Sequence, residues 1–307
     1  MACVIATYSS PNVNESEPLL SPETLGRLER LELVTRKIFR GQLKGERRSR
    51  RKGQSVEFAD YRNYVSGDDL RFIDWNLYAR LDKLFVRLYQ EEEDLHFFAL
   101  LDSSPSMMFG QPTKFRFAQK MAAALGYIGL CRSDRIKLEV LTDQVLPPAA
   151  ALRGKSNLWK LLRQLETLPT TSSTTLDAGV KKFCIRNPGK GIVVLLSDLM
   201  DKNGYQNAIR ALVARQYDVY VIQILSPEEL EPDLAGDLQL IDCEDGDVAD
   251  ISVSPRLLER YKATLQSFVG EIRQFCARRG IVHSVCSTAQ DVDQLVASYL
   301  RSRGLVR

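Results

Sequence analysis

Residues 97–107, FFALLDSSPSM, lead from an apolar run into a carboxylate and two hydroxyls. The run, which begins at Leu95, has the continuous apolar character of a strand that is buried on both faces of a sheet. Asp102 ends the run, and Ser104 and Ser106 follow at alternate positions. Alternate residues of an extended loop point to the same side, so these three side chains can converge. We therefore expect a buried strand that presents oxygen ligands at its end.

Four more apolar runs look like buried strands, at residues 136–141, 192–196, 219–225 and 281–286. Helical patterns lie between them, most clearly at residues 114–132 and 255–279. Apolar strands that alternate with amphipathic helices predict an α/β fold, with a mostly parallel sheet covered by helices on both faces. One stretch breaks the alternation: residues 238–253, with Asp245-Gly246 at their centre, predict an inserted hairpin.

The N-terminal part of the chain has a different composition. Apolar residues recur at the helical period from Pro22 to Phe39, and residues 36–53 carry nine Lys or Arg against one acid. Two strands are expected on either side of a turn near Gly67. We therefore divide the chain into a disordered lead-in at 1–20, a smaller N-terminal α+β module at 21–93 and the α/β domain at 94–307.

Composition and charge exclude several classes of protein. The 307 residues are 44% hydrophobic and 26% charged, as in ordinary globular proteins, and the net charge of +3 does not favour nucleic-acid binding by the whole chain. The apolar runs are too short to cross a bilayer, and the N-terminus lacks the features of a signal peptide. The six cysteines are scattered without a CxxC motif, which favours free thiols. We expect a cytoplasmic protein with no membrane span.

Further oxygen ligands occur later in the chain. Ligands of open α/β sheets bind at the carboxyl ends of strands. Asp198 comes shortly after the run at 192–196, and Thr174 or Thr175 opens a helix before that run. Carboxylates and hydroxyls are the hard ligands that Mg²⁺ or Mn²⁺ prefers. Two carboxylates roughly neutralise a divalent cation, which could then accept a further carboxylate from a partner.

This order of residues resembles the metal-ion-dependent adhesion site of a von Willebrand factor A domain, which has a Rossmann-like sheet. The matching residues, which the resemblance implies as metal ligands, are Asp102, Ser104, Ser106, Thr174 and Asp198. The chain has SSTTL at 172–176, where many such domains have a glycine before the Thr, so Thr175 stays an alternative to Thr174. Structural roles are the competing interpretation, because Ser-Ser-Pro-Ser also forms turns and Thr174 with Asp177 is close to a capping box.

A longer pattern lies upstream. Residues 57–80 match EFAxxRxYxxGDDxRxIDWxxxAR, the hallmark block of the family known as domain of unknown function 58, which this chain resembles over about residues 41 to 300. That resemblance implies a MoxR-type AAA+ ATPase as partner. The block holds three acids and three arginines, namely Arg62, Asp68, Asp69, Arg71, Asp74 and Arg80. We expect a partly buried ion-pair network that clasps the N-terminal module to the sheet domain, with a catalytic role as the alternative.

Several enzyme motifs are absent from the sequence. It contains no GxxxxGK[ST] loop, and no GxGxxG follows a strand. The two histidines, His96 and His283, fall inside predicted strands and are expected in the core. Without a base, Ser104 or Ser106 would be a poor nucleophile. We therefore expect a protein that is not an enzyme.

The function that these features favour is metal-dependent binding of a protein partner through its Asp or Glu, as an adaptor or co-chaperone of the implied ATPase. A metal-dependent hydrolase is one alternative, with Asp143 or Asp201 as a weakly supported base. Nucleic-acid binding through residues 36–53 is less favoured, because that run has only Phe39 as an aromatic residue.

Overall fold

The computed structural model describes residues 4–5, 18–31, 33, 56–91, 96–142, 150–169, 175–300 and 304–306. The chain forms two compact units: a larger one, Met1–Lys37 with Leu95–Arg307, and a smaller one, Ile38–Asp94. None of the described helices combines the length and the apolar character that a membrane span requires.

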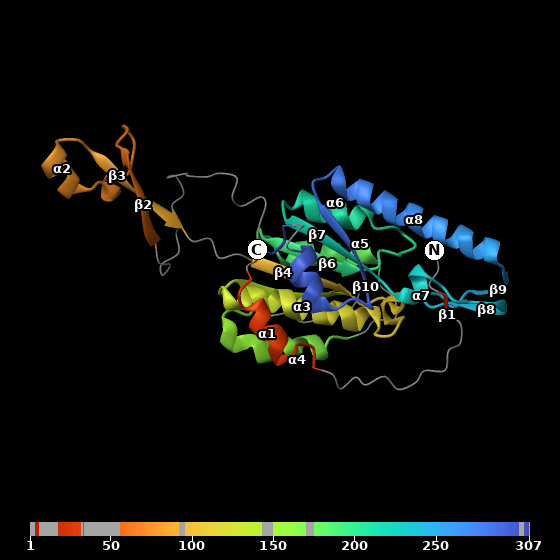
Figure 1. Ribbon diagram of the computed structural model, residues 1–307. Helices are drawn as coiled ribbons and strands as arrows, with labels where there is room; N and C mark the ends of the chain where they lie inside the picture. Colours follow the sequence, from red (N-terminus) through yellow and green to blue (C-terminus); the bar gives the residue numbers. More distant parts are fainter. Residues whose placement is uncertain are drawn as a thin grey trace. The chain divides into compact units, whose positions relative to one another are not determined.

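A five-stranded parallel sheet forms the centre of the larger unit (Figure 1), with strand order β10-β7-β6-β4-β5. Its strands are β4 (His96–Asp102), β5 (Arg135–Leu141), β6 (Ile192–Ser197), β7 (Asp218–Leu225) and β10 (Val282–Ser287). The five strands predicted from the apolar runs are thus confirmed. All their neighbours pair in parallel, as expected of strands that are buried on both faces.

Helices cover both faces of this sheet. The longer ones are α1 (Pro22–Leu28), α3 (Lys114–Cys131), α4 (Leu158–Glu166), α5 (Leu176–Arg186), α6 (Gln206–Ala214) and α8 (Pro255–Ala277); α7 (Pro227–Leu230) and α9 (Val292–Gln294) are short. Alternate residues of β4 enter different cores: Phe97 and Leu101 join the cluster that includes α3, whereas Phe98 and Leu100 join the cluster of α5, α6 and α8. The predicted von Willebrand factor A-like, Rossmann-like α/β class is confirmed.

The order of the strands contains a topological switch point. From β4 the chain proceeds to β5 on one side, and then returns to place β6, β7 and β10 on the other side. The loops that follow β4 and β6 therefore leave in opposite directions, which opens a crevice at the carboxyl edge of the sheet. Ligands of doubly wound sheets bind in such a crevice.

The predicted hairpin is present as β8 (Gly236–Asp242) and β9 (Val248–Val253), which pair antiparallel. Its turn contains Gly246, whose φ of +78° favours glycine. The strand β1 (Val4–Ile5) also pairs with β8. The expectation that residues 1–20 are wholly disordered is therefore wrong for these two residues, because β8 offers them an edge to pair with. It is also wrong for Leu19 and Leu20, which are buried in the core cluster of α3.

The structure divides the N-terminal part of the chain differently from the predicted module at 21–93. Helix α1 ends at Leu28, earlier than the expected Phe39, and it belongs to the larger unit. Leu28 is buried in the same cluster as residues of α3. The apolar side of α1 therefore finds a large core that the short smaller unit would not provide. The basic run at 36–53 lies outside the described residues.

The smaller unit contains the two predicted strands, β2 (Val56–Asn63) and β3 (Phe85–Glu91), paired antiparallel. Between them lie a 3-10 turn, η1 (Leu70–Phe72), and the unpredicted helix α2 (Trp75–Leu81). Asp74 caps α2 by accepting hydrogen bonds from the backbone N–H groups of Asn76 and Leu77.

Candidate functional site

The carboxyl edge of the sheet brings together two of the predicted metal ligands. Asp102 is the last residue of β4, and Asp198 directly follows β6. These strands are parallel neighbours, with Leu101 opposite Leu196, so their carboxyl ends meet at one edge. The edge between β4 and β6 is also the switch point, which is where ligands of doubly wound sheets bind.

The loop after β4 holds the next two predicted ligands. The Ser104 backbone N–H donates to Asp102 Oδ1 at 3.0 Å, which bends the loop back toward the strand. The hydroxyls of Ser104 and Ser106 form a hydrogen bond with their Oγ atoms 2.9 Å apart, and both side chains are buried. Neighbouring oxygens of an octahedral Mg²⁺ site, each about 2.1 Å from the ion, lie roughly 3 Å apart. The spacing of the two hydroxyls thus fits two ligands of one small cation.

Ser197 is a contact of this site that the sequence did not reveal. Its hydroxyl donates to Asp102 Oδ2 at 2.5 Å and accepts from the backbone N–H of Leu199 at 2.9 Å. Burial, together with the nearby Asp198 carboxylate, raises the pKa of Asp102 to about 6. A cation near Asp102 would oppose both effects, because it stabilises the ionised carboxylate.

A buried ammonium occupies the other side of Asp198. Lys114, the first residue of α3, donates from Nζ to Asp198 Oδ2 at 2.7 Å and to Glu229 Oε1 at 2.5 Å. The Lys114 side chain is 0% exposed, and both acids are buried. Burial raises the pKa of Glu229, the residue that closes a capping box with Ser226 at the start of α7.

The sequence analysis missed Lys114 and Glu229. Two weak signals were available: a lysine in the first turn of a helix, where the helix dipole disfavours a cation, and the capping-box pattern Ser226-Pro-Glu-Glu229. Neither signal shows that the two residues meet.

The charges of this cluster are unbalanced. Asp102, Asp198 and Glu229 would carry three negative charges when ionised, and Lys114 supplies one positive charge. Across the described part of the chain, no three His, Cys, Asp or Glu side chains are grouped as a metal site. A cation here would therefore depend on the serine hydroxyls as well as on Asp102 and Asp198.

The predicted threonine ligand cannot be placed, because Thr174 lies outside the described residues. Its alternative, Thr175, is the N-cap of α5, and its side chain accepts from the Ala178 backbone N–H at 3.4 Å. Asp201, named as a base for a hydrolase, accepts backbone hydrogen bonds through both oxygens, from Leu176 at 2.6 Å and from Asn203 at 2.7 Å. The other named base, Asp143, also lies outside the described residues.

Of the two histidines expected in the core, His283 lies there, whereas His96 is only partly buried. His283 is buried on β10, and its Nε2 is 3.1 Å from Gln223 Oε1. The Nε2 of Gln223 in turn donates to the backbone carbonyl of Asp198 at 3.2 Å. His283 thus has a structural role: through Gln223 it supports the end of β6, next to Asp198.

The ion-pair block of the smaller unit forms separate pairs. Arg62 binds Asp68 at 2.9 Å, and Arg71 binds Asp69 at 2.6 Å. Asp74 pairs with Arg87 of β3 at 2.8 Å and accepts from the Tyr61 hydroxyl at 3.0 Å.

These separate pairs differ from the single ion-pair network that was expected. Asp74 faces Arg87 because the bridge between Ile73 and Val86 holds the start of α2 beside β3. Arg80 makes no ion pair with any residue that the structure describes. All the observed pairs link parts of the smaller unit, and the clasp to the sheet domain stays a prediction.

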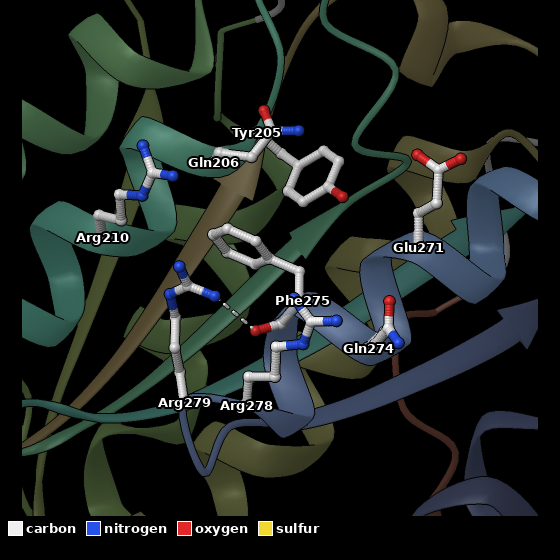
Figure 2. A pocket seen from close by; sticks show the side chains of 8 residues that line it. All are labelled: Tyr205, Gln206, Arg210, Glu271, Gln274, Phe275, Arg278 and Arg279. Carbon is white, nitrogen blue, oxygen red and sulfur yellow. Dashed lines mark hydrogen bonds between the residues drawn. The ribbon is translucent and has the colours of Figure 1, made fainter.

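A separate pocket of about 530 Å³ lies between α6 and α8 (Figure 2). Its wall includes Arg210, Arg278 and Phe275, and the Arg279 guanidinium stacks over the Phe275 ring at 3.6 Å. Arg279 also donates to the Phe275 backbone carbonyl at 2.9 Å, as Figure 2 shows. None of the predicted ligands lines this pocket.

Comparison with known proteins identifies relatives of unknown function. Residues 60–267 match the model of the family described as "Protein of unknown function DUF58". The chain is 27% identical over 245 residues to "Uncharacterized protein Mb1516" of Mycobacterium bovis and to "Uncharacterized protein Rv1480" of Mycobacterium tuberculosis, a region that covers 78% of this chain and 77% of each relative.

Two solved structures are also similar. One is the conserved hypothetical protein BatB from Bacteroides thetaiotaomicron, with 15% identity and a TM-score of 0.41, covering 68% of this chain and 98% of that one. The other is an aerotolerance-related membrane protein from Bacteroides fragilis, with 13% identity and a TM-score of 0.40, covering 68% and 99%.

Proposed function

This chain belongs to the DUF58 family, and we propose that its larger unit is a non-enzymatic module that binds a protein partner through a divalent cation, Mg²⁺ or Mn²⁺. The cation would be held by Asp102, Ser104, Ser106 and Asp198, with Thr174 as the remaining residue of the motif. The partner would contribute an Asp or Glu carboxylate. When bound, the cation supplies an electrophilic centre that such a carboxylate can join.

One observation carries this proposal: buried negative charge in excess, beside two hydroxyls at ligand spacing, at the switch point of the sheet. Two acids, Asp198 and Glu229, share the one ammonium of Lys114, a third acid, Asp102, is buried nearby, and the Ser104 and Ser106 oxygens lie 2.9 Å apart. Buried carboxylates that outnumber their positively charged partners are unfavourable, so such a cluster favours a cation. Small divalent cations prefer carboxylate and hydroxyl oxygens over other ligands.

The contact of Lys114 with Asp198 bears on the partner's carboxylate. The ammonium neutralises part of the Asp198 charge through Oδ2, and the Met200 backbone N–H donates to Oδ1 at 3.1 Å. A cation in this site would then keep more of its positive charge than a cation bound by two carboxylates that have no ammonium partner. Its remaining positive charge would favour an incoming acid over a neutral group.

We assign the partner by family resemblance, as a MoxR-type AAA+ ATPase for which this chain acts as adaptor or co-chaperone. The sequence contains no P-loop motif, so ATP hydrolysis would be the work of the partner. Co-purification with such an ATPase should depend on Mg²⁺ and should be lost in Asp102→Asn. Co-purification that Asp102→Asn leaves unchanged would exclude the cation-mediated contact.

The cation itself is tested by chemical unfolding with Mg²⁺ or Mn²⁺. A ligand at one hundred times its Kd adds about 2.7 kcal/mol to the free energy of unfolding. We expect that gain in the wild type and a much smaller gain in Ser104→Ala/Ser106→Ala, which keeps every charge. Asp250→Asn, which removes an exposed carboxylate of β9, should behave like the wild type. A folded wild type that gains nothing from either cation would overturn the proposal.

A further inference from the structure

The turn of the β8–β9 hairpin contains an acid, Glu244, and Lys202 ties this turn to the loop that bears Asp198. We propose that this hairpin is part of the site: Lys202 holds its turn so that Glu244 accepts hydrogen bonds from the waters that the cation keeps. The inference rests on the proposed function, because it requires a cation at Asp102 and Asp198. It adds a positioning residue, Lys202, and an outer acceptor, Glu244, that the metal motif does not contain.

Ion pairs fix the place of the turn. Lys202 lies four residues after Asp198, in the loop that follows β6. Its ammonium is 2.8 Å from Asp242 Oδ2 and also binds Asp245, so it contacts both ends of the segment around Glu244. Helix α7 directly follows β7, so it lies at the carboxyl edge of the sheet. Figure 1 shows β8 and β9 next to α7, at the same end of the larger unit. The hairpin is thereby tied to the loop that bears Asp198.

Glu244 lies among other acids. Its backbone N–H donates to Asp242 Oδ1 at 2.8 Å, and it forms no ion pair with any residue that the structure describes. The pKa of Glu244 is raised to about 7, mainly by burial. The negative charges of nearby acids raise it further; in order of effect they are Asp198, Asp201, Asp242 and Asp102. The ion pairs of Lys202 thus hold the turn of Glu244 at the loop that bears Asp198, yet Glu244 is not grouped with Asp102 and Asp198 as a ligand in the described part of the chain.

This placement fits an acceptor for cation-bound water. Mg²⁺ gives up its waters reluctantly and often keeps several of them, so groups one water away contribute to its binding. Such outer partners change metal affinity by about 10- to 100-fold when they are mutated. A half-buried acid held near four others by a lysine is unfavourable by itself, and it becomes favourable when a divalent cation enters.

The first test measures the Kd of Mn²⁺ by electron paramagnetic resonance of the free ion. The variants are Glu244→Gln and Asp247→Asn, which each remove one negative charge from the same hairpin; Asp247 is exposed. We expect Glu244→Gln to weaken Mn²⁺ binding about tenfold and Asp247→Asn to change it less than twofold. A Kd of Glu244→Gln within twofold of the wild type would overturn the inference, whereas a wild type that binds no Mn²⁺ would overturn the proposed function first.

Lys202→Gln provides a test of opposite sign. Removal of a positive charge beside a cation site should by itself strengthen Mn²⁺ binding. If Lys202 acts by holding Glu244 in place, the variant should instead bind Mn²⁺ several-fold more weakly. Tighter binding than in the wild type would show that Lys202 is only a repelling charge and would overturn the positioning role.

Water proton relaxation of bound Mn²⁺ gives a second readout, the number of waters on the ion. Glu244→Gln should leave this number unchanged, because the residue acts through water; a gain of one water would overturn that role. The variant should fold at least as well as the wild type without metal, since it loses a carboxylate that other acids repel. Unfolding curves in a chelator check this expectation.

Discussion

The buried Lys114 offers a direct test of the charges beneath the candidate site. Its ammonium is enclosed between Asp198 and Glu229, with N···O distances of 2.7 and 2.5 Å. Lys114→Met keeps most of the apolar side chain and removes the charge. The two carboxylates would then remain buried with no ammonium between them.

The expected loss of stability is large. Removal of one partner from a buried ion pair costs about 3 to 5 kcal/mol in the free energy of unfolding, because the other charge stays in a poorly solvated place. Lys181→Met is a matched control: Lys181 binds Asp177 at the same 2.7 Å, but its side chain is 62% exposed. An exposed pair of this kind contributes about 0.5 kcal/mol or less.

The pH dependence has a definite sign. Burial already raises the pKa of Glu229 above its ordinary value, and loss of Lys114 removes the group that lowers it most. A carboxyl with a raised pKa in the folded state favours folding at low pH and loses that contribution as the pH rises through the folded pKa. The difference between Lys114→Met and the wild type should therefore be larger at pH 8 than at pH 5.

The assay is urea unfolding at pH 8 in a chelator, followed by circular dichroism. Lys114→Met/Glu229→Gln should recover part of the loss, because it also removes one of the two buried carboxylates, and the double-mutant cycle should give a coupling of about 1 to 3 kcal/mol. A loss below 1 kcal/mol in Lys114→Met, or two effects that simply add, would refute the account of a buried ion triad.

Three further outcomes follow from other parts of the molecule. Asp74→Asn should speed hydrogen exchange of α2, and the same weakening should occur in the wild type as the pH falls below about 4, because Arg87 holds the pKa of Asp74 well below its ordinary value. Gly191→Ala should lower the free energy of unfolding by about 1 to 3 kcal/mol in urea titrations, because its Cβ would lie 2.3 Å from the His96 backbone oxygen. Cys276 and Cys286, whose pKa values burial raises to about 12, should not react with a disulfide reagent at pH 8 until the protein unfolds, as thiol titration will show.

The sheet was predictable because each of its strands is a continuous apolar run. Strands buried on both faces have that pattern, and five such runs give β4, β5, β6, β7 and β10. The motif after β4 was predictable for the same reason, since a polar loop that follows a buried strand must lie at the edge of the sheet. Helix α2 was missed because it has only seven residues and exposes Trp75 and Leu81, so it has no apolar stripe to recognise.

The charged partners were not predictable because their contacts are distant in the sequence. Lys114 meets an acid 84 positions later and another 115 positions later, and neither separation is set by a local pattern. The pairing of Asp74 with Arg87 was also missed, because it depends on the bridge between Ile73 and Val86, which no local pattern indicates. Local periodicity determines which residues are buried, whereas the pairing of buried charges depends on the completed fold.

The Lys114 ammonium and the proposed cation would offset the charges of different carboxylates at this edge of the sheet. Lys114 is the first residue of α3, and its single positive charge permanently offsets part of the negative charge of Asp198 and Glu229, which helps that side to be buried. The Asp102 side has no such lysine among the described residues; it has two serine hydroxyls, a carboxyl with a raised pKa and an acid-bearing hairpin tied down by Lys202. A second lysine there would stabilise the fold equally well, but it would leave no exchangeable position for a partner's carboxylate. The asymmetry therefore favours a site whose charge is completed from outside the chain.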